Sequence, residues 1–315
     1  MKLVIGFITY NELSAKYLDE FLLSLKVALG FLKQKDFKVF VFDNSSPDFN
    51  ANRLAIEFFN SNNDFFIEYD SAGENLGFGR TYNILINKAK REKAEYFLII
   101  NPDTIMDSGA ISCLIKALDG DKKLASVSPK ILRWDFENKQ KTRDIDSCGI
   151  ILKSALRFND LGQGEIDSGQ YNQSAILGPS GACGLFRLSA LGKISKNGQY
   201  FDERFFMYKE DCDLAYRLFL AGFTSKLISE AIVFHDRTTK SSGNGLTNII
   251  KDRRQKSRQI RAWSLQGQNL IFRKYFKNQT FVNKLLIIFR VLAMFVFSLI
   301  LEQFLLKNYF VKNKF

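Results

Sequence analysis

The sequence predicts an α/β protein with a mostly parallel sheet, helices on both faces of that sheet, and a helical C-terminal extension. Two observations predict the sheet: short apolar runs rich in β-branched residues alternate with segments of helical period, and the links between them are short. A third observation separates the extension, because the balanced charge of residues 1–239 gives way to a strongly basic tail. The 315 residues are enough for one large core with an appendage, or for two domains.

Strands and helices are expected in regular alternation. Residues 3–9 (LVIGFIT) form the first strand, and apolar positions from 18 to 32 then recur at helical spacing. The order continues with a strand at 38–42, a helix at 51–60, a strand at 65–69, a helix from the turn at 74–83 to about residue 90, and a strand at 96–100. Residues 132–176 predict only irregular hairpins and a loop, because Gly, Asn, Asp and Gln dominate them. The last strand-like run, 225–234, ends at His235, the single histidine of the chain.

Polar residues follow several of these strands directly, namely Asn11, Asp43, Asn44 and Asp103. They would share one edge of a parallel sheet, and ligands of such sheets bind at the carboxyl ends of the strands. Asp103 could therefore ligate a Mg²⁺ or Mn²⁺ ion that bridges a diphosphate, although an Asp that simply ends a strand is common. The glycine-containing turn at 75–80 could hold phosphate through backbone N–H groups or could be a plain helix start, since it lacks the G-x-G-x-x-G order.

An acidic pair begins a helix within residues 201–217 (FDERFFMYKEDCDLAYR). Apolar residues follow a helical period from Glu210 onward, so Glu210 and Asp211 fall in the first turn, where the helix dipole favours negative charge. The pair is therefore either a cap of a packed helix or a catalytic group. His235 has two interpretations as well: a metal or phosphate ligand on the same edge of the sheet, or a hydrogen-bonded histidine near a surface loop.

The tail combines basic charge with one long apolar segment. Residues 240–315 hold 15 Lys and Arg against 2 acids, a net charge of +13, and the remaining 30 basic and 31 acidic residues give residues 1–239 a net charge of −1. Residues 285–306 are apolar nearly all round and would extend about 33 Å as a helix. We expect, in order of preference, a helix in the plane of an anionic membrane, a buried or oligomer-forming helix, or a true span. Basic charge beside an apolar helix, without a nucleic-acid-binding motif, favours lipid over nucleic acid as the partner.

Taken together, the motifs of residues 1–240 resemble those of the family-2 inverting glycosyltransferases of the GT-A fold, close to the rhamnosyltransferase-like branch. The matching segments, in chain order, are TYN at 9–11, DNSS at 43–46, NLGFGRTYN at 75–83, NPDT at 101–104, GPSGACGLFR at 178–187, FDERFFMYKEDCDLAYRLFLAG at 201–222, and His235. The resemblance implies a Rossmann-like GT-A catalytic domain at 1–240 and leaves 241–315 as a basic, membrane-associating helical extension.

The resemblance also implies roles for individual residues. The donor nucleotide would be bound by Thr9, Tyr10, Asn11, Asp43, Asn44, Asn75, Gly77, Arg80, Asn101 and Asp103. The donor sugar and the acceptor would lie against Gly181, Ala182, Cys183 and Tyr208. Asp103 would be the metal-binding carboxylate of a D-x-D-type motif whose first position is Asn101 here, and His235 would be a second ligand to Mg²⁺ or Mn²⁺. Asp211, with Glu210 beside it, matches the catalytic base.

The implied activity is transfer of a sugar, with L-rhamnose as one candidate, from a dTDP- or UDP-linked donor to a lipid-linked or polysaccharide acceptor in cell-surface glycan synthesis. The alternative is a non-catalytic nucleotide-sugar-binding subunit of a glycan-assembly complex. We expect a cytoplasmic protein at the inner face of the cell membrane, because Met1 leads directly into a strand and the four cysteines form no C-x-x-C pair. We also expect a homo-oligomer formed through the C-terminal helices. We do not expect nucleic acid to be a partner.

Overall fold

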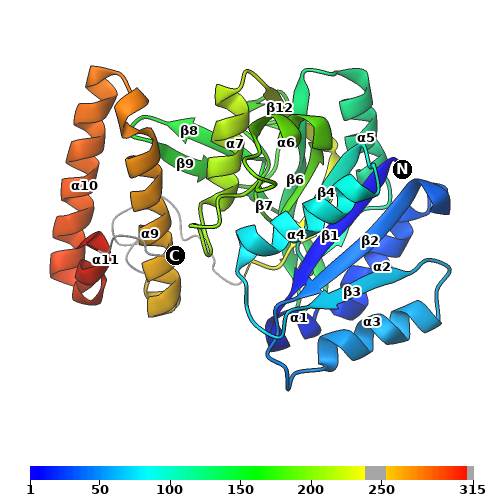
Figure 1. Ribbon diagram of the computed structural model, residues 1–315. Coiled ribbons are helices and arrows are strands. Elements are labelled where there is room, and N and C mark those ends of the chain that lie inside the picture. The colour runs from blue at the N-terminus through cyan, green and yellow to red at the C-terminus, as the bar shows by residue number, and fades with distance from the viewer. Residues whose placement is uncertain (238–252, 311–315) are drawn as a thin grey trace.

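The computed structural model describes residues 1–237 and 253–310, and its centre is one mixed sheet of ten strands (Figure 1). In spatial order the strands are β10 (Ala175–Ile176), β12 (Thr224–His235), β6 (Leu124–Asp135), β11 (Cys183–Arg187), β4 (Tyr96–Ile100), β1 (Leu3–Thr9), β2 (Phe37–Asp43) and β3 (Ile67–Ser71); β5 (Thr104–Met106) pairs with β12, and β7 (Gln140–Ser147) with β6. Strands β3, β2, β1 and β4 are parallel, and the antiparallel β11 joins them to the parallel pair of β6 and β12. The predicted α/β fold is confirmed.

Helices cover both faces of this sheet, because each strand alternates its side chains between two cores. In β1, Leu3 and Ile5 face one core, together with α2 (Leu18–Leu29), α3 (Ala51–Ser61) and α5 (Ala110–Gly120). Val4 faces the opposite core, which is covered by α4 (Phe78–Arg91), α6 (Leu188–Ile194) and α7 (Glu210–Leu220). Gly6 leaves room for the ring of Phe97, since a Cβ at this position would lie 2.5 Å from its Cζ. Strands buried on both faces read as continuous apolar runs, which is why the sequence pattern predicts them.

The segment 132–176, for which only hairpins and a loop were predicted, contains β7 and a separate two-stranded sheet. That sheet consists of β8 (Ile150–Lys153) and β9 (Arg157–Asp160), which are antiparallel. Ala155 and Leu156 at its turn both have positive φ, 60° and 50°. Figure 1 shows this hairpin reaching from the main sheet toward the C-terminal helices. No prediction covered α5, β5 or β6.

In the part that the structure describes, the extension includes α9 (Arg258–Tyr275), η2 (Phe276–Asn278), α10 (Phe281–Leu301), η3 (Gln303–Leu305) and α11 (Leu306–Phe310). It shares a core with the rest of the chain, and the members of this core include Phe158, Tyr216, Leu270, Ile271, Phe272, Tyr275 and Ile287. Polar contacts add to this packing, because Lys274 on α9 donates to Asp202 (2.7 Å), and Tyr275 donates to the buried Asp213 of α7 (2.7 Å). The domain boundary predicted at 240/241 lies outside the described residues.

Candidate active site

The carboxyl ends of β1 and β2 meet at Asp43, because their parallel register places Thr9 beside it. Asp43 is only 1% exposed. Its Oδ1 accepts hydrogen bonds from the hydroxyls of Thr9 (2.8 Å) and Ser45 (2.6 Å), and its Oδ2 accepts one from Tyr69 (2.7 Å). Burial first, and then the bond to Asp43, raises the pKa of the Tyr69 phenol, so Tyr69 remains a donor at all physiological pH values. Asp43 therefore fixes the loop that leaves β2, and both of its oxygens are engaged.

Asn11 fixes the neighbouring loop, between β1 and the short helix α1 (Asn11–Ala15). Its φ of 43° lies in the left-handed region, where Asn is among the tolerated residues. The Asn11 backbone N–H donates to the Ser45 hydroxyl (2.7 Å), and its side-chain oxygen accepts from the Ser46 N–H (3.1 Å). The backbone N–H of Tyr10 donates to the Ser14 hydroxyl (2.9 Å). The loops after β1 and β2 are thus tied together at one edge of the sheet.

The glycine-containing turn before α4 is tied to the same edge by Asn44. The Asn44 side-chain oxygen accepts from the Thr81 hydroxyl (3.1 Å), and the Asn75 side-chain oxygen accepts from the Gly77 N–H (2.9 Å). Gly77 has a φ of 76°, and a Cβ there would lie 2.6 Å from the backbone oxygen of Phe206. Only glycine fits this conformation at so close an approach. The turn therefore contacts both the end of β2 and the segment that precedes α7.

His235, the last residue of β12, lies between two carboxylates. Its Nε2 is 3.3 Å from Asp103 Oδ2, and its Nδ1 is 2.8 Å from Asp146 Oδ2. Burial lowers the pKa of the imidazole, but the charges of Asp103 and Asp146 outweigh burial and raise the pKa to about 10. Burial conversely raises the pKa of Asp146, and the His235 charge outweighs it and brings that pKa down to about 2. His235 is therefore a cation at neutral pH in this arrangement.

The pair of Asp103 and His235 has one feature that fits a divalent cation. Asp103 Oδ1 is buried and accepts no hydrogen bond from the described residues. An unpaired carboxylate oxygen is a ligand that Mg²⁺ or Mn²⁺ prefers. His235 fits as a second ligand only in its neutral form, because a protonated imidazole has no free lone pair. Within residues 1–237 and 253–310, no three His, Cys, Asp or Glu side chains are grouped so as to hold a metal.

Arg237 extends this charged cluster, and the sequence prediction missed it. One of its terminal nitrogens lies 3.1 Å from Asp146 Oδ1, and the other lies 3.1 Å from Asp160 Oδ2. Burial alone would lower the pKa of Arg237, but the charges of Asp160, Asp146 and Asp211 outweigh burial, so the net pKa is raised. The charge of Asp211, at the acidic start of α7, therefore also acts on the His235 cluster. Its position two residues after the single histidine was a usable signal, whereas Asp146 and Asp160 lie in the segment without a clear pattern.

The acidic pair begins α7, as predicted. Asp211 is half-buried; its Oδ2 accepts from the Gly181 N–H (3.0 Å), and its Oδ1 accepts from the Cys212 N–H (2.7 Å). Glu210 is 6% exposed, and its Oε2 is buried without a hydrogen bond to any described residue. Burial, followed by the charge of Asp211, raises the pKa of Glu210 to about 8. Glu210 is therefore mostly protonated at pH 7, which makes Asp211 the better candidate for a base.

The turn directly before this pair is strained and is covered by α9. Tyr208 and Lys209 have φ of 72° and 76°, although neither is glycine. Such backbone conformations cost about 1–3 kcal/mol each and persist only where the surroundings hold them. Gly267 of α9 packs directly on the turn, since a Cβ there would lie 2.6 Å from the Tyr208 backbone oxygen. Trp263 of α9 packs on Phe206, with ring centroids 5.0 Å apart. The extension thus supports the turn that carries Glu210 and Asp211.

The remaining predicted residues have less specific surroundings. The Asn101 N–H donates to the Ala182 backbone oxygen (2.9 Å), which joins the end of β4 to the segment before β11. Cys183 is buried within the core on β11, and burial raises the pKa of its thiol. Its side chain is therefore a core group rather than part of a pocket wall. Arg80 and Tyr208 are exposed.

A mixed α/β sheet whose strand-end loops meet an acidic helix start is the architecture of a GT-A glycosyltransferase. The sequence model of the family described as "Glycosyl transferase family 2" matches residues 4–194. The chain belongs to this family, which confirms the resemblance drawn from its motifs.

Individual relatives agree with this membership. The chain is 26% identical over 264 residues to "N-acetylglucosaminyl-diphospho-decaprenol L-rhamnosyltransferase" of Mycobacterium tuberculosis, covering 73% of this chain and 74% of the relative. Its structure is similar to that of S. aureus TarS 1-349 in complex with UDP-GlcNAc, with a TM-score of 0.55, 16% identity, and coverage of 98% of this chain and 78% of TarS 1-349. It is also similar to GalNAc-T7 with UDP, GalNAc and Mn²⁺, with a TM-score of 0.55, 10% identity, and coverage of 81% and 48%. At these identities the structural likeness shows the fold.

Proposed function

We propose that the chain is an inverting glycosyltransferase that moves a sugar from a nucleoside-diphosphate donor to a lipid-linked acceptor. The observation that carries the proposal is the Asp211 carboxylate, which is anchored by two backbone N–H groups at the start of α7 beside the buried Glu210. The name of the mycobacterial relative supports L-rhamnose as the sugar and a polyprenyl-diphosphate-linked acceptor. The UDP complexes of the TarS structures support a nucleoside diphosphate as the leaving group.

The proposed reaction is a single displacement. Asp211 removes the proton of the acceptor hydroxyl while that oxygen attacks the anomeric carbon of the donor sugar, and the bond from this carbon to the diphosphate breaks. The two hydrogen bonds from Gly181 and Cys212 hold the carboxylate in place and leave lone pairs for the acceptor proton. General-base assistance of this kind contributes about 10²–10⁴-fold to the rate.

The departing diphosphate gains negative charge, and the His235 cluster is the proposed partner for it. His235 and Arg237 are both cationic here, held by Asp103, Asp146 and Asp160. Because these two cations face three carboxylates, the cluster would stabilise the negative charge that develops on the diphosphate only with a further cation bound. Asp103, through its unpaired oxygen, and His235, once it has lost its proton, would hold a Mg²⁺ or Mn²⁺ ion in place of that proton, and the bound ion would neutralise diphosphate charge. The Mn²⁺ in the GalNAc-T7 complex supports a divalent cofactor.

The proposed location is the inner face of the membrane, with α10 in the membrane plane. By length and composition this 21-residue helix is the one within the described ranges that could cross a membrane. One stripe of α10 is occupied by protein, because Asn283 accepts from the Ala155 N–H (2.7 Å) and Arg290 donates to the Leu156 backbone oxygen (3.0 Å). Contacts along this stripe favour a helix lying flat over one that leaves the protein to span.

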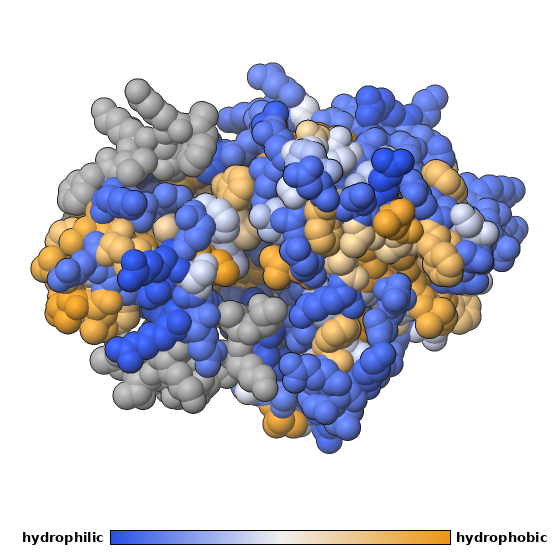
Figure 2. Space-filling view, turned by 90° about the horizontal axis from the view of Figure 1, so that it is seen from below, coloured by the Kyte–Doolittle hydropathy of each residue, from blue (hydrophilic) through white to orange (hydrophobic). Residues whose placement is uncertain are grey.

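The opposite stripe of α10 is apolar and exposed. It consists of Phe281, Val282, Leu285, Leu286, Ile288, Phe289, Leu292, Val296, Leu299 and Ile300. Figure 2 shows hydrophobic residues gathered at the left edge of the molecule, where α10 lies in Figure 1, next to strongly hydrophilic ones. Residues 253–310 hold eleven Lys and Arg and one acid, Glu302. Apolar area together with basic charge supports an anionic lipid surface as the partner.

Transfer assays with Asp211→Asn test the catalytic proposal. Full-length protein would be supplied with a panel of nucleotide sugars, including dTDP-L-rhamnose and UDP-GlcNAc, and a synthetic GlcNAc-diphospho-polyprenol, with products identified by mass spectrometry. We expect Asp211→Asn to lose at least about 10²-fold in transfer and to keep the thermal protection given by the donor. Asp64→Asn, the same change at an exposed site, is the matched control. Donor binding without transfer by the wild type would favour the alternative, a non-catalytic nucleotide-sugar-binding subunit.

A further inference from the structure

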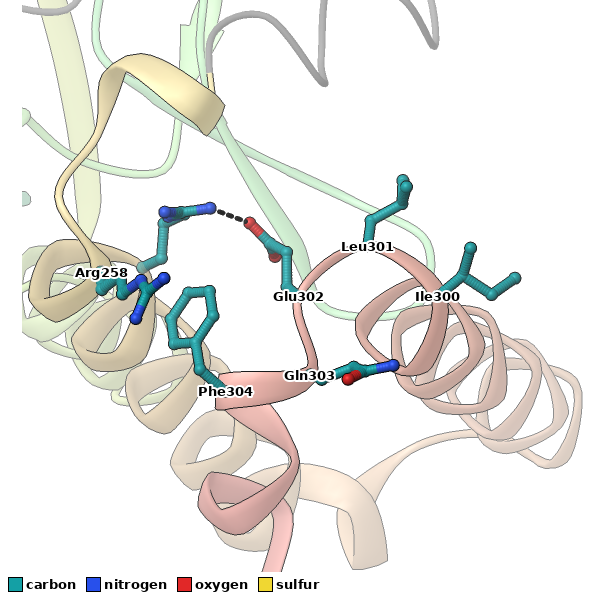
Figure 3. Close-up of a pocket in the computed structure, with 7 residues that line it drawn as sticks. Arg258, Ile300, Leu301, Glu302, Gln303 and Phe304 are labelled. Carbon is teal, nitrogen blue, oxygen red and sulfur yellow. Dashed lines mark hydrogen bonds and ion pairs between the residues drawn. The ribbon is translucent and has the colours of Figure 1, made fainter.

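A cavity of about 350 Å³ lies between the start of α9 and the end of α10, away from the site described above. It is lined by Arg258, Arg261, Ile300, Leu301, Glu302, Gln303 and Phe304. Figure 3 shows Arg258 and Phe304 on one side of Glu302, and Ile300 and Leu301 on the other. Its size is within the range of small-ligand sites.

The charge of this cavity is positive. Glu302 is buried and ionised. Burial alone would raise its pKa, but Arg253 and Arg261 outweigh burial, so the net pKa is lowered. Its Oε2 accepts from the Arg253 Nε (3.0 Å), and its Oε1 accepts from Arg261 (2.8 Å). These contacts leave the Arg261 Nε without an acceptor in the described part of the chain. Arg258 is exposed and forms no ion pair with any described residue; its guanidinium lies 5.4 Å from the centre of the Phe304 ring. The lining of the cavity holds two arginines, Arg258 and Arg261, against one glutamate, and this excess of positive charge makes an anion the expected ligand.

The cavity also adjoins the exposed apolar stripe of α10. Ile300 is 68% exposed and Leu301 is 47% exposed, and both line the cavity at the end of that helix. A single ligand could therefore place an anionic group against the arginines and an apolar chain along α10. A phosphate-bearing lipid has this combination, whereas a soluble nucleotide or inorganic phosphate has no apolar part to use.

One helix links the cavity to the catalytic turn. Arg258 and Arg261 lie in the first turns of α9, and Gly267 of the same helix packs on the turn before Glu210. Arg261 and Gly267 are six residues apart, which corresponds to about 9 Å along a helix axis. A lipid-linked acceptor carries a sugar on its phosphate, and that sugar would extend from the arginines toward the active site. Bulk phospholipid carries no such sugar, so the spacing favours the acceptor as the ligand.

We propose that this cavity binds the diphosphate of the polyprenyl-diphosphate-linked acceptor, with the polyprenyl chain along the apolar stripe of α10. The proposal rests on the lipid-linked acceptor of the proposed function. It assigns substrate binding to the extension, outside residues 1–240 that carry the motifs of the family.

Binding of farnesyl diphosphate to full-length protein tests this proposal, measured by isothermal titration calorimetry. We expect Arg258→Gln to weaken binding at least about tenfold, since it removes a charged donor to phosphate. Lys277→Gln, an equal loss of charge at an exposed position of η2, should bind as the wild type does. Equal affinity of all three proteins would overturn the proposal. Farnesol and inorganic pyrophosphate should each bind more weakly than farnesyl diphosphate, and tighter binding of pyrophosphate would also overturn it.

Vesicles of phosphatidylglycerol separate the acceptor from bulk anionic lipid. We expect Arg258→Gln and Lys277→Gln to bind these vesicles equally. If Arg258→Gln alone lost vesicle binding by as much as it loses farnesyl diphosphate, the cavity would be a general phospholipid site and the acceptor assignment would be wrong. Thermal protection of the wild-type chain by nucleotide sugars is scored separately, so failure of the proposed function is distinguishable from failure of this site.

Discussion

Substitution of Gly267 by alanine tests whether α9 holds the catalytic turn. The added Cβ would lie 2.6 Å from the Tyr208 backbone oxygen and 3.3 Å from the Lys209 Cβ, so the turn or the helix must move. Overpacking of this kind costs about 1–3 kcal/mol, while alanine in place of glycine gains about 1 kcal/mol in a helix interior. The net change in the free energy of unfolding is therefore a loss of about 0–2 kcal/mol.

The effect on turnover should be larger than the effect on stability. Glu210 and Asp211 directly follow the turn that the new methyl group displaces, and a misplacement of about 1 Å at a reacting group can cost about 10²-fold in rate. We expect Gly267→Ala to lose about 10–100-fold in kcat, with a decrease in Tm of no more than several degrees. Steady-state transfer assays and thermal unfolding of the same preparations measure the two effects.

Gly192→Ala is the matched control. Gly192 lies in α6, and a Cβ there would meet nothing within 4 Å, so only the gain from helix propensity remains. We expect its Tm to be unchanged or raised and its turnover to equal that of the wild type. If Gly267→Ala behaved in the same way in both assays, α9 would not support the catalytic turn, and the proposed link between the extension and catalysis would be refuted.

Two further predictions concern the buried acid and the membrane. Folding raises the pKa of Glu210 from 4.5 to about 8, so the stability contributed by its protonated form is full below pH 4.5 and is lost as the pH rises toward 8. Glu210→Gln does not titrate at this position. Relative to this variant, the free energy of unfolding of the wild type should fall by up to about 1.4 kcal/mol per pH unit between pH 5 and 8. Denaturant unfolding of both proteins at pH 5 and pH 8 measures this difference, and an equal loss in the two proteins would contradict the prediction. Phe289→Asp on the exposed stripe of α10 should reduce co-sedimentation with anionic vesicles at least about tenfold. Phe58→Asp on α3 is the control and should not reduce it, although the two side chains are similarly exposed, 67% for Phe289 and 72% for Phe58. Equal retention of both variants on the vesicles would favour an oligomer contact for α10.

The parts of the fold that follow local patterns were predictable from the sequence. Continuous apolar runs predicted β1, β2 and β4, because strands buried on both faces need apolar side chains at every position. The polar residues after these strands were recognisable because chain direction alone places them at one edge of a parallel sheet. Asp43 and Asp103 were found in this way, whereas Asp211 was found from the helical period that begins at the acidic pair.

Other residues of the site were beyond prediction because distant segments position them. Asp146 reaches His235 across 89 positions of sequence, from a segment without regular alternation. Gly267 reads in the sequence only as a weak point of a helix, and its close contact with Tyr208 depends on how α9 docks. α10 is apolar on nearly every face, so no periodicity marks the packed stripe, and only Asn283 and Arg290 indicate it. Helix faces chosen by tertiary packing leave little local signal.

The continuous helix α9 fixes one distance within the proposed complex. Arg258, which we propose contacts the lipid phosphate, and Gly267, which packs on the turn before Glu210, are nine positions apart, and this corresponds to about 14 Å along the helix axis. In the proposed complex this helix of constant length would set the distance between the lipid phosphate and the Asp211 carboxylate. The enzyme would then select acceptors by the distance of a hydroxyl from its diphosphate, favouring lipids that carry a short glycan over those already elongated. Chain-length control in such a system would follow from geometry and would require no recognition of the sugars further along the chain.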